Sequence, residues 1–137
     1  MRALIVIVLA VISLAPATFY AGPSNTDKDQ LACDELEGAD ADLNRVYRQV
    51  MTEYAEDSRF TASLREAQRA WITFRDLHVE SRYPGPNKRA EYGSVYSTCH
   101  CLEMTELTEQ RTAQLRRWLE GVEEGDVCRG SIRMKEE

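Results

Sequence analysis

Three consecutive side chains, Cys99, His100 and Cys101, form the densest group of potential metal ligands in the sequence. Thiolate sulfur and imidazole nitrogen bind zinc and Cu(I) well. The ligands of structural zinc sites, however, are usually separated by about two to four residues. In an oxidising compartment, disulfide formation explains these cysteines better. We therefore predict no metal and no cofactor, and keep a thiol or metal module as an alternative.

The segment LREAQRAWITFRD, residues 64–76, holds a second concentration of side chains that can do chemistry. Glu66 and Arg69 lie three positions apart, so a surface ion pair on a helix explains them. Glu66 and Asp76 lie about 15 Å apart along one helix, too far for the paired carboxylates of a glycosidase. Neither a glycine-rich phosphate loop nor a Gly-x-Ser-x-Gly motif occurs in the sequence. We predict that the protein is not an enzyme and has no catalytic residue.

Polar residues inside the expected helices favour a structural role. Asn44 lies within the first of these helices, and Gln68, Arg75 and Asp76 lie within the second. Asparagine lowers helix propensity, and hydrogen bonds between helices would compensate for the loss. Because buried polar pairs can fix the alignment of helices, we predict a polar seam of these four residues and favour it over a binding site.

Apolar residues recur at spacings of three and four in the stretches 31–54, 60–78 and 95–122. The buried stripe expected for the second helix consists of Phe60, Leu64, Ala67, Trp71, Phe74 and either Leu77 or His78. Candidate caps are Ser24 or Thr26, then Asp57 or Ser58, then Ser94. Gly38 weakens the first helix by about 1 kcal/mol, which favours a start in two pieces. The pattern predicts an all-α fold, a three-helix up-down-up bundle with a short C-terminal tail, stapled by disulfides.

The first 21 residues are typical of a secretory signal peptide. One basic residue, Arg2, precedes a short apolar run, and Ala15-Pro16-Ala17 follows it. Cleavage after residue 17 or 21 leaves a single domain over residues 22–137, with a core at 33–122 and a partly mobile tail at 123–137. The apolar run is shorter than the roughly 20 residues of a membrane span. We expect a periplasmic or secreted protein without a stable membrane anchor, and an uncleaved anchor is the alternative.

All four cysteines lie in the mature chain, so each is a disulfide candidate: Cys33, Cys99, Cys101 and Cys128. The starts of the first and third helices share one end of the bundle, which allows Cys33 to meet either Cys99 or Cys101. Cys128 is harder to place, because residues 101–121 rise about 30 Å whereas seven extended residues span at most about 25 Å. Either the third helix is bent or shortened, or Cys128 pairs elsewhere.

The charge of the chain limits its partners. Loss of Arg2 with the signal peptide changes the formal net charge from −6 to −7, because residues 1–21 hold no other charged side chain. Such a chain is a poor ligand for nucleic acid and is suited to a cationic protein partner. The segment YPGPNKRAEYGS, residues 83–94, carries the candidate partner-binding residues Tyr83, Lys88, Arg89 and Tyr92 on a stretch stiffened by two prolines. The alternative is a plain connection between helices.

Three blocks of sequence occur in a characteristic order: ADADLNRVYRQVM at 39–51, LREAQRAWITFRD at 64–76 and LTEQRTAQL at 107–115. The most specific parts of these blocks are Leu43-Asn44 with Tyr47, then Gln68-x-x-Trp71-x-x-x-Arg75-Asp76, then Thr108-x-x-Arg111. Together they resemble the N-terminal domain family of the lysozyme inhibitor LprI, small exported helical proteins of bacteria. The resemblance covers nearly all of residues 33–119. It departs at Val79, where family members often carry a cysteine, so the family's disulfide pattern does not transfer directly.

The resemblance implies a periplasmic or secreted protein that binds and inhibits lysozyme and so protects peptidoglycan. A lysozyme cleft presents two catalytic carboxylates, which Lys88 or Arg89 can approach, with Tyr83 or Tyr92 packing alongside. Acidic side chains can meet the basic surface around that cleft; the candidates are Glu53, Glu56 and Asp57, or Glu120, Glu123 and Glu124. The alternative function is an envelope adaptor, a protein-binding module without lysozyme activity.

Overall fold

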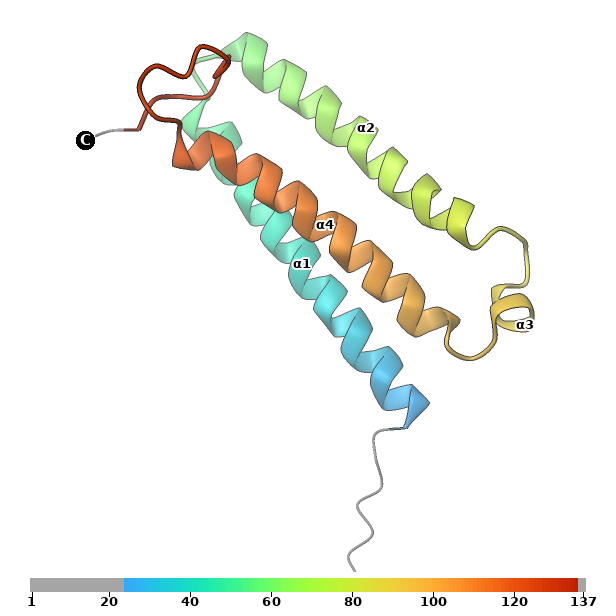
Figure 1. The fold of residues 1–137 in the computed structure, drawn as a ribbon. Helices are drawn as coiled ribbons and strands as arrows, with labels where there is room; N and C mark the ends of the chain where they lie inside the picture. Colours follow the sequence, from blue (N-terminus) through green and yellow to red (C-terminus); the bar gives the residue numbers. More distant parts are fainter. Residues whose placement is uncertain (1–23, 136–137) are drawn as a thin grey trace, which may run out of the picture.

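The computed structural model describes residues 24–135, which form four helices (Figure 1). They are α1 (Asn25–Glu53), α2 (Ser58–Arg82), α3 (Lys88–Tyr92) and α4 (Tyr96–Glu120). The predicted all-helical class is confirmed, since the described part has no strand beyond one isolated bridge. None of the helices in this part combines the length and apolarity that a membrane crossing requires. The predicted signal peptide lies outside the described residues.

The sequence signals for helix ends predict most of the observed boundaries. Ser24 caps α1 in a capping box, in which its hydroxyl accepts a hydrogen bond from the Asp27 N–H at 3.2 Å and the Asp27 carboxylate accepts one from the Ser24 N–H at 2.9 Å. Asp57 caps α2. The expected division of the first helix at Gly38 is wrong, because α1 is continuous. The cost of one glycine is small beside the burial of a long apolar face on the same helix.

The three long helices do not pack equally. α1 and α4 form the closest pair, and α2, which runs opposite to both in Figure 1, contacts mainly α4. The central cluster of buried apolar side chains consists of Leu43, Val46, Val50, Tyr54, Leu64 and Leu115. It lies where the end of α1, the start of α2 and the end of α4 meet. The opposite end of the molecule is closed by the Cys33–Cys101 disulfide between α1 and α4.

The buried face of α2 differs from the predicted stripe. Leu64 is buried as expected, but Phe74 is 54% exposed and Leu77 is 63% exposed. The line that faces the other helices includes the buried side chains of Gln68 and Val79 and the partly buried Arg75. Gln68 and Arg75 thus lie inward where the apolar pattern had placed Ala67 and Phe74, and α1 and α4 supply their hydrogen-bond partners.

The connection between α2 and α4 contains a helix that the sequence pattern did not predict. Asn87 caps α3 by accepting a hydrogen bond from the Ala90 N–H at 3.2 Å. α4 begins at Tyr96 and ends before Gly121, whose φ is 70°. A Cβ at Gly121 would lie 3.0 Å from the Arg133 carbonyl oxygen, so glycine is required both by the backbone conformation and by the returning tail.

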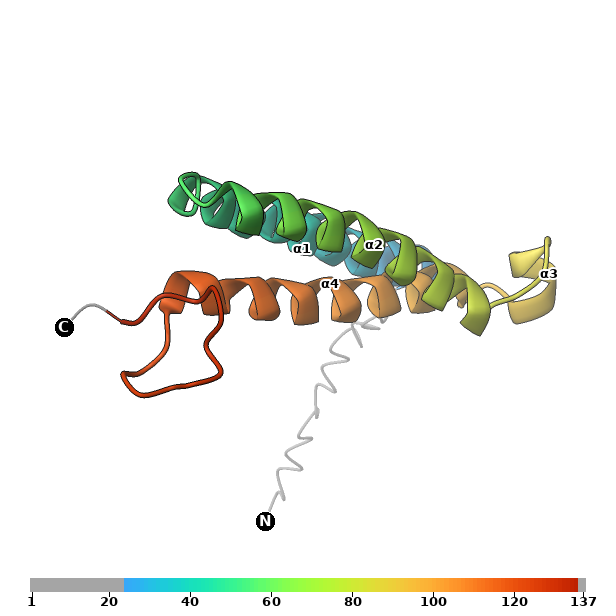
Figure 2. The same cartoon turned by 90° about the horizontal axis from the view of Figure 1, so that it is seen from above.

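The tail returns to the end of α4 as a loop (Figure 2). The Val122 N–H donates to the Arg133 carbonyl and the Lys135 N–H donates to the Val122 carbonyl, both at 2.9 Å. Tyr54 joins this tail to the core: its hydroxyl donates to the Trp118 carbonyl at 2.9 Å and accepts from the Arg133 N–H at 3.1 Å. The mobility of residues 123–137 in solution stays a prediction.

Replacement of Tyr54 by phenylalanine is expected to lower the free energy of unfolding by about 1–3 kcal/mol, because it leaves two backbone groups without their partner. Amide hydrogen exchange at Val122 and Lys135 should accelerate more than exchange in α1. Tyr47→Phe is the matched control, since the Tyr47 hydroxyl makes no hydrogen bond within residues 24–135. Unchanged exchange in the tail of Tyr54→Phe would contradict this role for the hydroxyl.

Candidate functional site

Arg75 is the centre of a polar network between the long helices. Its side chain is 12% exposed, and its Nη1 donates to Asp40 Oδ1 of α1 at 2.8 Å and to Thr108 Oγ1 of α4 at 3.1 Å. Its Nε donates to Asp76 Oδ1 at 3.1 Å. The fully buried Thr108 hydroxyl donates in turn to the Met104 carbonyl at 2.7 Å. One guanidinium therefore connects three helices.

Gln68 and Arg111 form a second link, about two turns along α2 from the first. Arg111 Nε donates to Gln68 Oε1 at 2.9 Å, and Arg111 Nη1 donates to Gln114 Oε1 at 3.0 Å. The Gln68 side chain is buried and Arg111 is half-buried. Burial lowers the pKa of the Arg111 guanidinium from its ordinary value, because a charge loses hydration there.

Two of the four residues of the predicted seam, Gln68 and Arg75, contact the other helices. Asp76 is exposed and pairs with Arg75 of its own helix, and Asn44 lies at an exposed position of α1 and makes no side-chain hydrogen bond within residues 24–135. Asp40, one turn before Asn44, supplies the contact from α1 instead. The partners on α4 are Thr108 and Arg111, the pair whose spacing contributes to the family resemblance.

The cysteines form one disulfide, between Cys33 and Cys101, with Cα atoms 5.1 Å apart. Cys99 is half-buried and free, and Cys128 is exposed and free. Successive residues of a helix are rotated by about 100°, so Cys99 and Cys101 face different sides of α4 and only one can reach α1. Because α4 is continuous from Tyr96 to Glu120, Cys128 lies near the opposite end of that helix from Cys99, and neither of these two disulfide candidates forms a bridge.

This disulfide also removes one thiolate from the Cys99-His100-Cys101 group. Within residues 24–135 there is no group of three or more His, Cys, Asp or Glu side chains arranged to hold a metal ion.

The candidate partner-binding residues gather around α3, where three tyrosines pack together. The ring centroid of Tyr83 lies 5.4 Å from that of Tyr92 and 5.3 Å from that of Tyr96. Burial, followed by the proximity of Cys99, raises the pKa of Tyr83 above its ordinary value. The Tyr92 hydroxyl donates to the Pro84 carbonyl at 2.6 Å. These contacts stiffen the segment.

The two cations of this segment have different environments. Lys88 Nζ donates to Glu80 Oε1 at 2.6 Å and also to the Tyr83 carbonyl, so its charge is used inside the molecule. Arg89 is exposed and makes no side-chain contact of this kind within the described residues. The acidic residues proposed to meet a basic partner lie at or just beyond the C-terminal ends of α1 and α4, and Figure 1 shows these ends on the opposite side of the molecule from α3. The sequence-based hypothesis therefore describes two separate surfaces.

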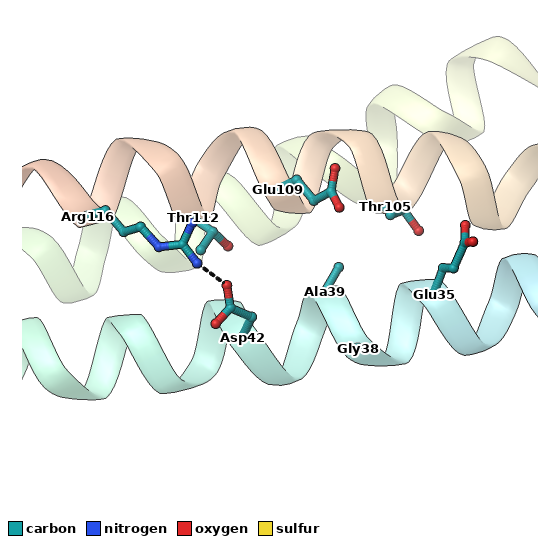
Figure 3. A pocket seen from close by; sticks show the side chains of 8 residues that line it. All are labelled: Glu35, Gly38, Ala39, Asp42, Thr105, Glu109, Thr112 and Arg116. Carbon is teal, nitrogen blue, oxygen red and sulfur yellow. Dashed lines mark hydrogen bonds and ion pairs between the residues drawn. The ribbon is translucent and has the colours of Figure 1, made fainter.

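A groove of about 500 Å³ lies between α1 and α4 (Figure 3) and was not predicted from the sequence. Its lining residues are Glu35, Gly38, Ala39, Asp42, Thr105, Glu109, Thr112 and Arg116. Arg116 forms an ion pair with Asp42, whereas Glu35 and Glu109 have no ion-pair partner within residues 24–135. The groove is thus acidic. The sequence feature that could have indicated this groove is Gly38, because a glycine inside a helix can leave space beside a neighbouring helix.

Comparison with families of known proteins gives a match over most of the chain. The family model described as "Lysozyme inhibitor LprI" matches residues 21–115, which is more than half of the chain. The match ends before the last turn of α4, so Trp118 and the tail lie outside it. No curated protein and no solved structure matches the chain significantly.

Proposed function

The chain belongs to the LprI family of lysozyme inhibitors, and we propose on this basis that it is exported, binds a lysozyme and inhibits it. The observation that carries the proposal is that the residues whose spacing resembles the family also form the hydrogen bonds between helices. Gln68 contacts Arg111, and Arg75 contacts Thr108. The mature chain, residues 22–137, is proposed to be a single domain of up-down-up topology, located in the periplasm or secreted.

Charge supports a lysozyme as the partner. A mature net charge of −7 favours approach to a strongly basic protein through long-range attraction. We place the inhibitory contact at the α3 end, where the exposed Arg89 can approach the catalytic carboxylates of a lysozyme cleft. Tyr83 and Tyr92 pack against each other beside it, and Lys88 holds the segment in shape. A segment ordered before binding loses less entropy when it binds.

The experiment is lysis of peptidoglycan-containing cells by a chicken-type lysozyme, with and without purified, oxidised residues 22–137. The salt concentration is about 0.15 M, so that weak attraction between exposed charges is screened. Stoichiometric inhibition is the expected result. If the chain does not inhibit at a large molar excess, it is not an inhibitor of chicken-type lysozyme, and the adaptor function is favoured. A pull-down from periplasmic extract would then be the next experiment.

Reversal of the charge at Arg89, by Arg89→Glu, is expected to weaken inhibition at least about tenfold, because it places a carboxylate against the carboxylates of the cleft. Arg65→Glu is the matched control, since Arg65 is an exposed arginine on α2 with no described ion pair. Lys88 is not suitable for this test, because its replacement also breaks contacts within the segment. Inhibition retained in full by Arg89→Glu would exclude the α3 end as the inhibitory surface.

The adaptor is the second candidate function, and the exposed Phe74 and Leu77 of α2 favour it. Neighbouring apolar side chains on a helix surface are common in sites that bind other proteins. The two functions differ in the salt dependence and selectivity of binding: an inhibitor should hold lysozyme at physiological ionic strength, whereas a generally acidic surface should release it.

A further inference from the structure

A second concave surface lies beside α2, the end of α4 and the tail. It consists of two adjoining cavities of about 930 and 280 Å³, which share Phe60, Ser63 and Ser131. We call the smaller one the Trp118 groove; it is lined by Phe60, Ser63, Leu64, Ala67, Arg111, Trp118 and Ser131. None of these residues lines the acidic groove between α1 and α4.

The aromatic wall of the Trp118 groove is held in place by its neighbours. The ring centroid of Phe60 lies 4.7 Å from that of Tyr54 and 5.7 Å from that of Trp118. The Trp118 indole N–H donates to Ser131 Oγ at 3.0 Å, so the returning tail orients the indole. Such a wall offers flat apolar surface to a ligand without rearrangement, together with polar groups at its edge.

Arg111 is the only described arginine of the Trp118 groove, and its charge is not neutralised. No carboxylate within residues 24–135 lies within 4.0 Å of its guanidinium, whose two described hydrogen bonds go to amide oxygens. The other partly buried arginines differ: Arg75 pairs with Asp40 and Asp76, and Arg116 pairs with Asp42. A charge removed from water is normally paired, because its desolvation is costly.

The remaining donors of Arg111 are therefore available to an anion. A guanidinium has five N–H donors in a planar fork, and Arg111 uses two in the described contacts. The fork binds carboxylates well, and its bonds to a carboxylate are strengthened by charge. The lowered pKa of Arg111 agrees with a guanidinium that has lost hydration without gaining a counter-ion.

We propose that the Trp118 groove binds a small molecule that joins a carboxylate to a flat apolar body. The carboxylate pairs with Arg111, and the flat body lies against Phe60 and Trp118 within a cavity of about 280 Å³. Ser63 and Ser131 at the edge supply hydroxyl groups for polar substituents. The inference is independent of lysozyme inhibition, which we place at the other end of the molecule.

The test is a titration of ¹⁵N-labelled, oxidised residues 22–137 with benzoate, followed by the two indole N–H signals of the chain. Benzyl alcohol, which has a similar ring without the charge, is the matched probe. We expect a saturable shift of the Trp118 signal with benzoate, a much smaller shift of the Trp71 signal, and at least about tenfold weaker binding of benzyl alcohol. No saturable shift at Trp118, or equal affinity for the two probes, would overturn the proposal.

Two pairs of variants locate the site. Arg111→Gln should remove the preference for benzoate, whereas Arg117→Gln, an exposed change on the same helix, should keep it. Ala67→Phe should fill the Trp118 groove and abolish the shift without altering the helix links, and Ala70→Phe, one turn away on exposed α2 surface, should not. If Arg111→Gln fails to fold, the comparison of Ala67→Phe with Ala70→Phe tests the site. Benzoate binding retained by Ala67→Phe would show that the ligand binds elsewhere.

Discussion

Replacement of Cys33 and Cys101 together by alanine is expected to lower the free energy of unfolding by about 4 kcal/mol. The disulfide joins α1 to α4 across a sequence separation of 68 residues. In the chain-entropy model, a cross-link that closes a loop of this length restricts the unfolded chain by about 4 kcal/mol. Because small domains are stable by only about 5–15 kcal/mol, the double variant should unfold at a much lower denaturant concentration.

Denaturation of the oxidised proteins in guanidinium chloride, followed by circular dichroism, measures this difference. The matched control is Cys99→Ala with Cys128→Ala, which removes the two free thiols and should cost less than about 1 kcal/mol. Thiol titration of the unfolded, unreduced chain should give two thiols, and peptide mapping should join Cys33 to Cys101. A Cys33–Cys99 peptide in that map would contradict the assignment.

The helices and their ends were largely predictable, because their signals are local. Side-chain caps at Ser24 and Asp57 act within one turn of the chain, whereas the predicted cap Ser94 is wrong, because α4 follows Val95 and has no side-chain cap. The rotation of α2 was not predictable in the same way. The periodicity of apolar residues assigned Phe74 to the core, whereas the inward line includes Arg75, whose partners come from residues 35 and 33 positions away.

In the candidate site, too, features set by neighbouring residues could be predicted, whereas features set by residues distant in the sequence could not. The segment at 83–94 could be recognised from its prolines, tyrosines and cations, but the difference between Lys88 and Arg89 depends on Glu80 and on the Tyr83 carbonyl. The pairing of Cys33 was narrowed to two cysteines by topology, and the rotation of α4 selects Cys101. Trp118 falls within the apolar stretch 95–122, but its contact with Ser131 could not be predicted, because that contact requires the tail to return.

Replacement of Arg75 by methionine is expected to lower the free energy of unfolding by about 2–3 kcal/mol. Removal of one partner from a buried charge pair typically costs about 3–5 kcal/mol, but the Asp40 side chain is 42% exposed and water can solvate part of it. Thr108 is fully buried, so its hydroxyl loses a donor that water cannot replace. Methionine keeps most of the side-chain volume, so the polar contacts are the main difference.

The position of α2 should depend on the same contacts. Hydrogen exchange in Arg75→Met should accelerate in α2 more than in α1, because α2 contacts the α1 and α4 pair over a smaller surface and the Arg75 network is one of its main links. Arg65→Met is the matched control and should change stability by less than about 0.5 kcal/mol, as expected for an exposed site.

The stability of Arg75→Lys should lie between those of Arg75→Met and the parent protein, because an ammonium keeps the charge but lacks the planar fork that reaches Asp40 and Thr108 together. If Arg75→Met were as stable as the parent protein, the contacts of Arg75 would contribute nothing to stability. The residues around Arg75 that resemble the family would then be explained by partner binding.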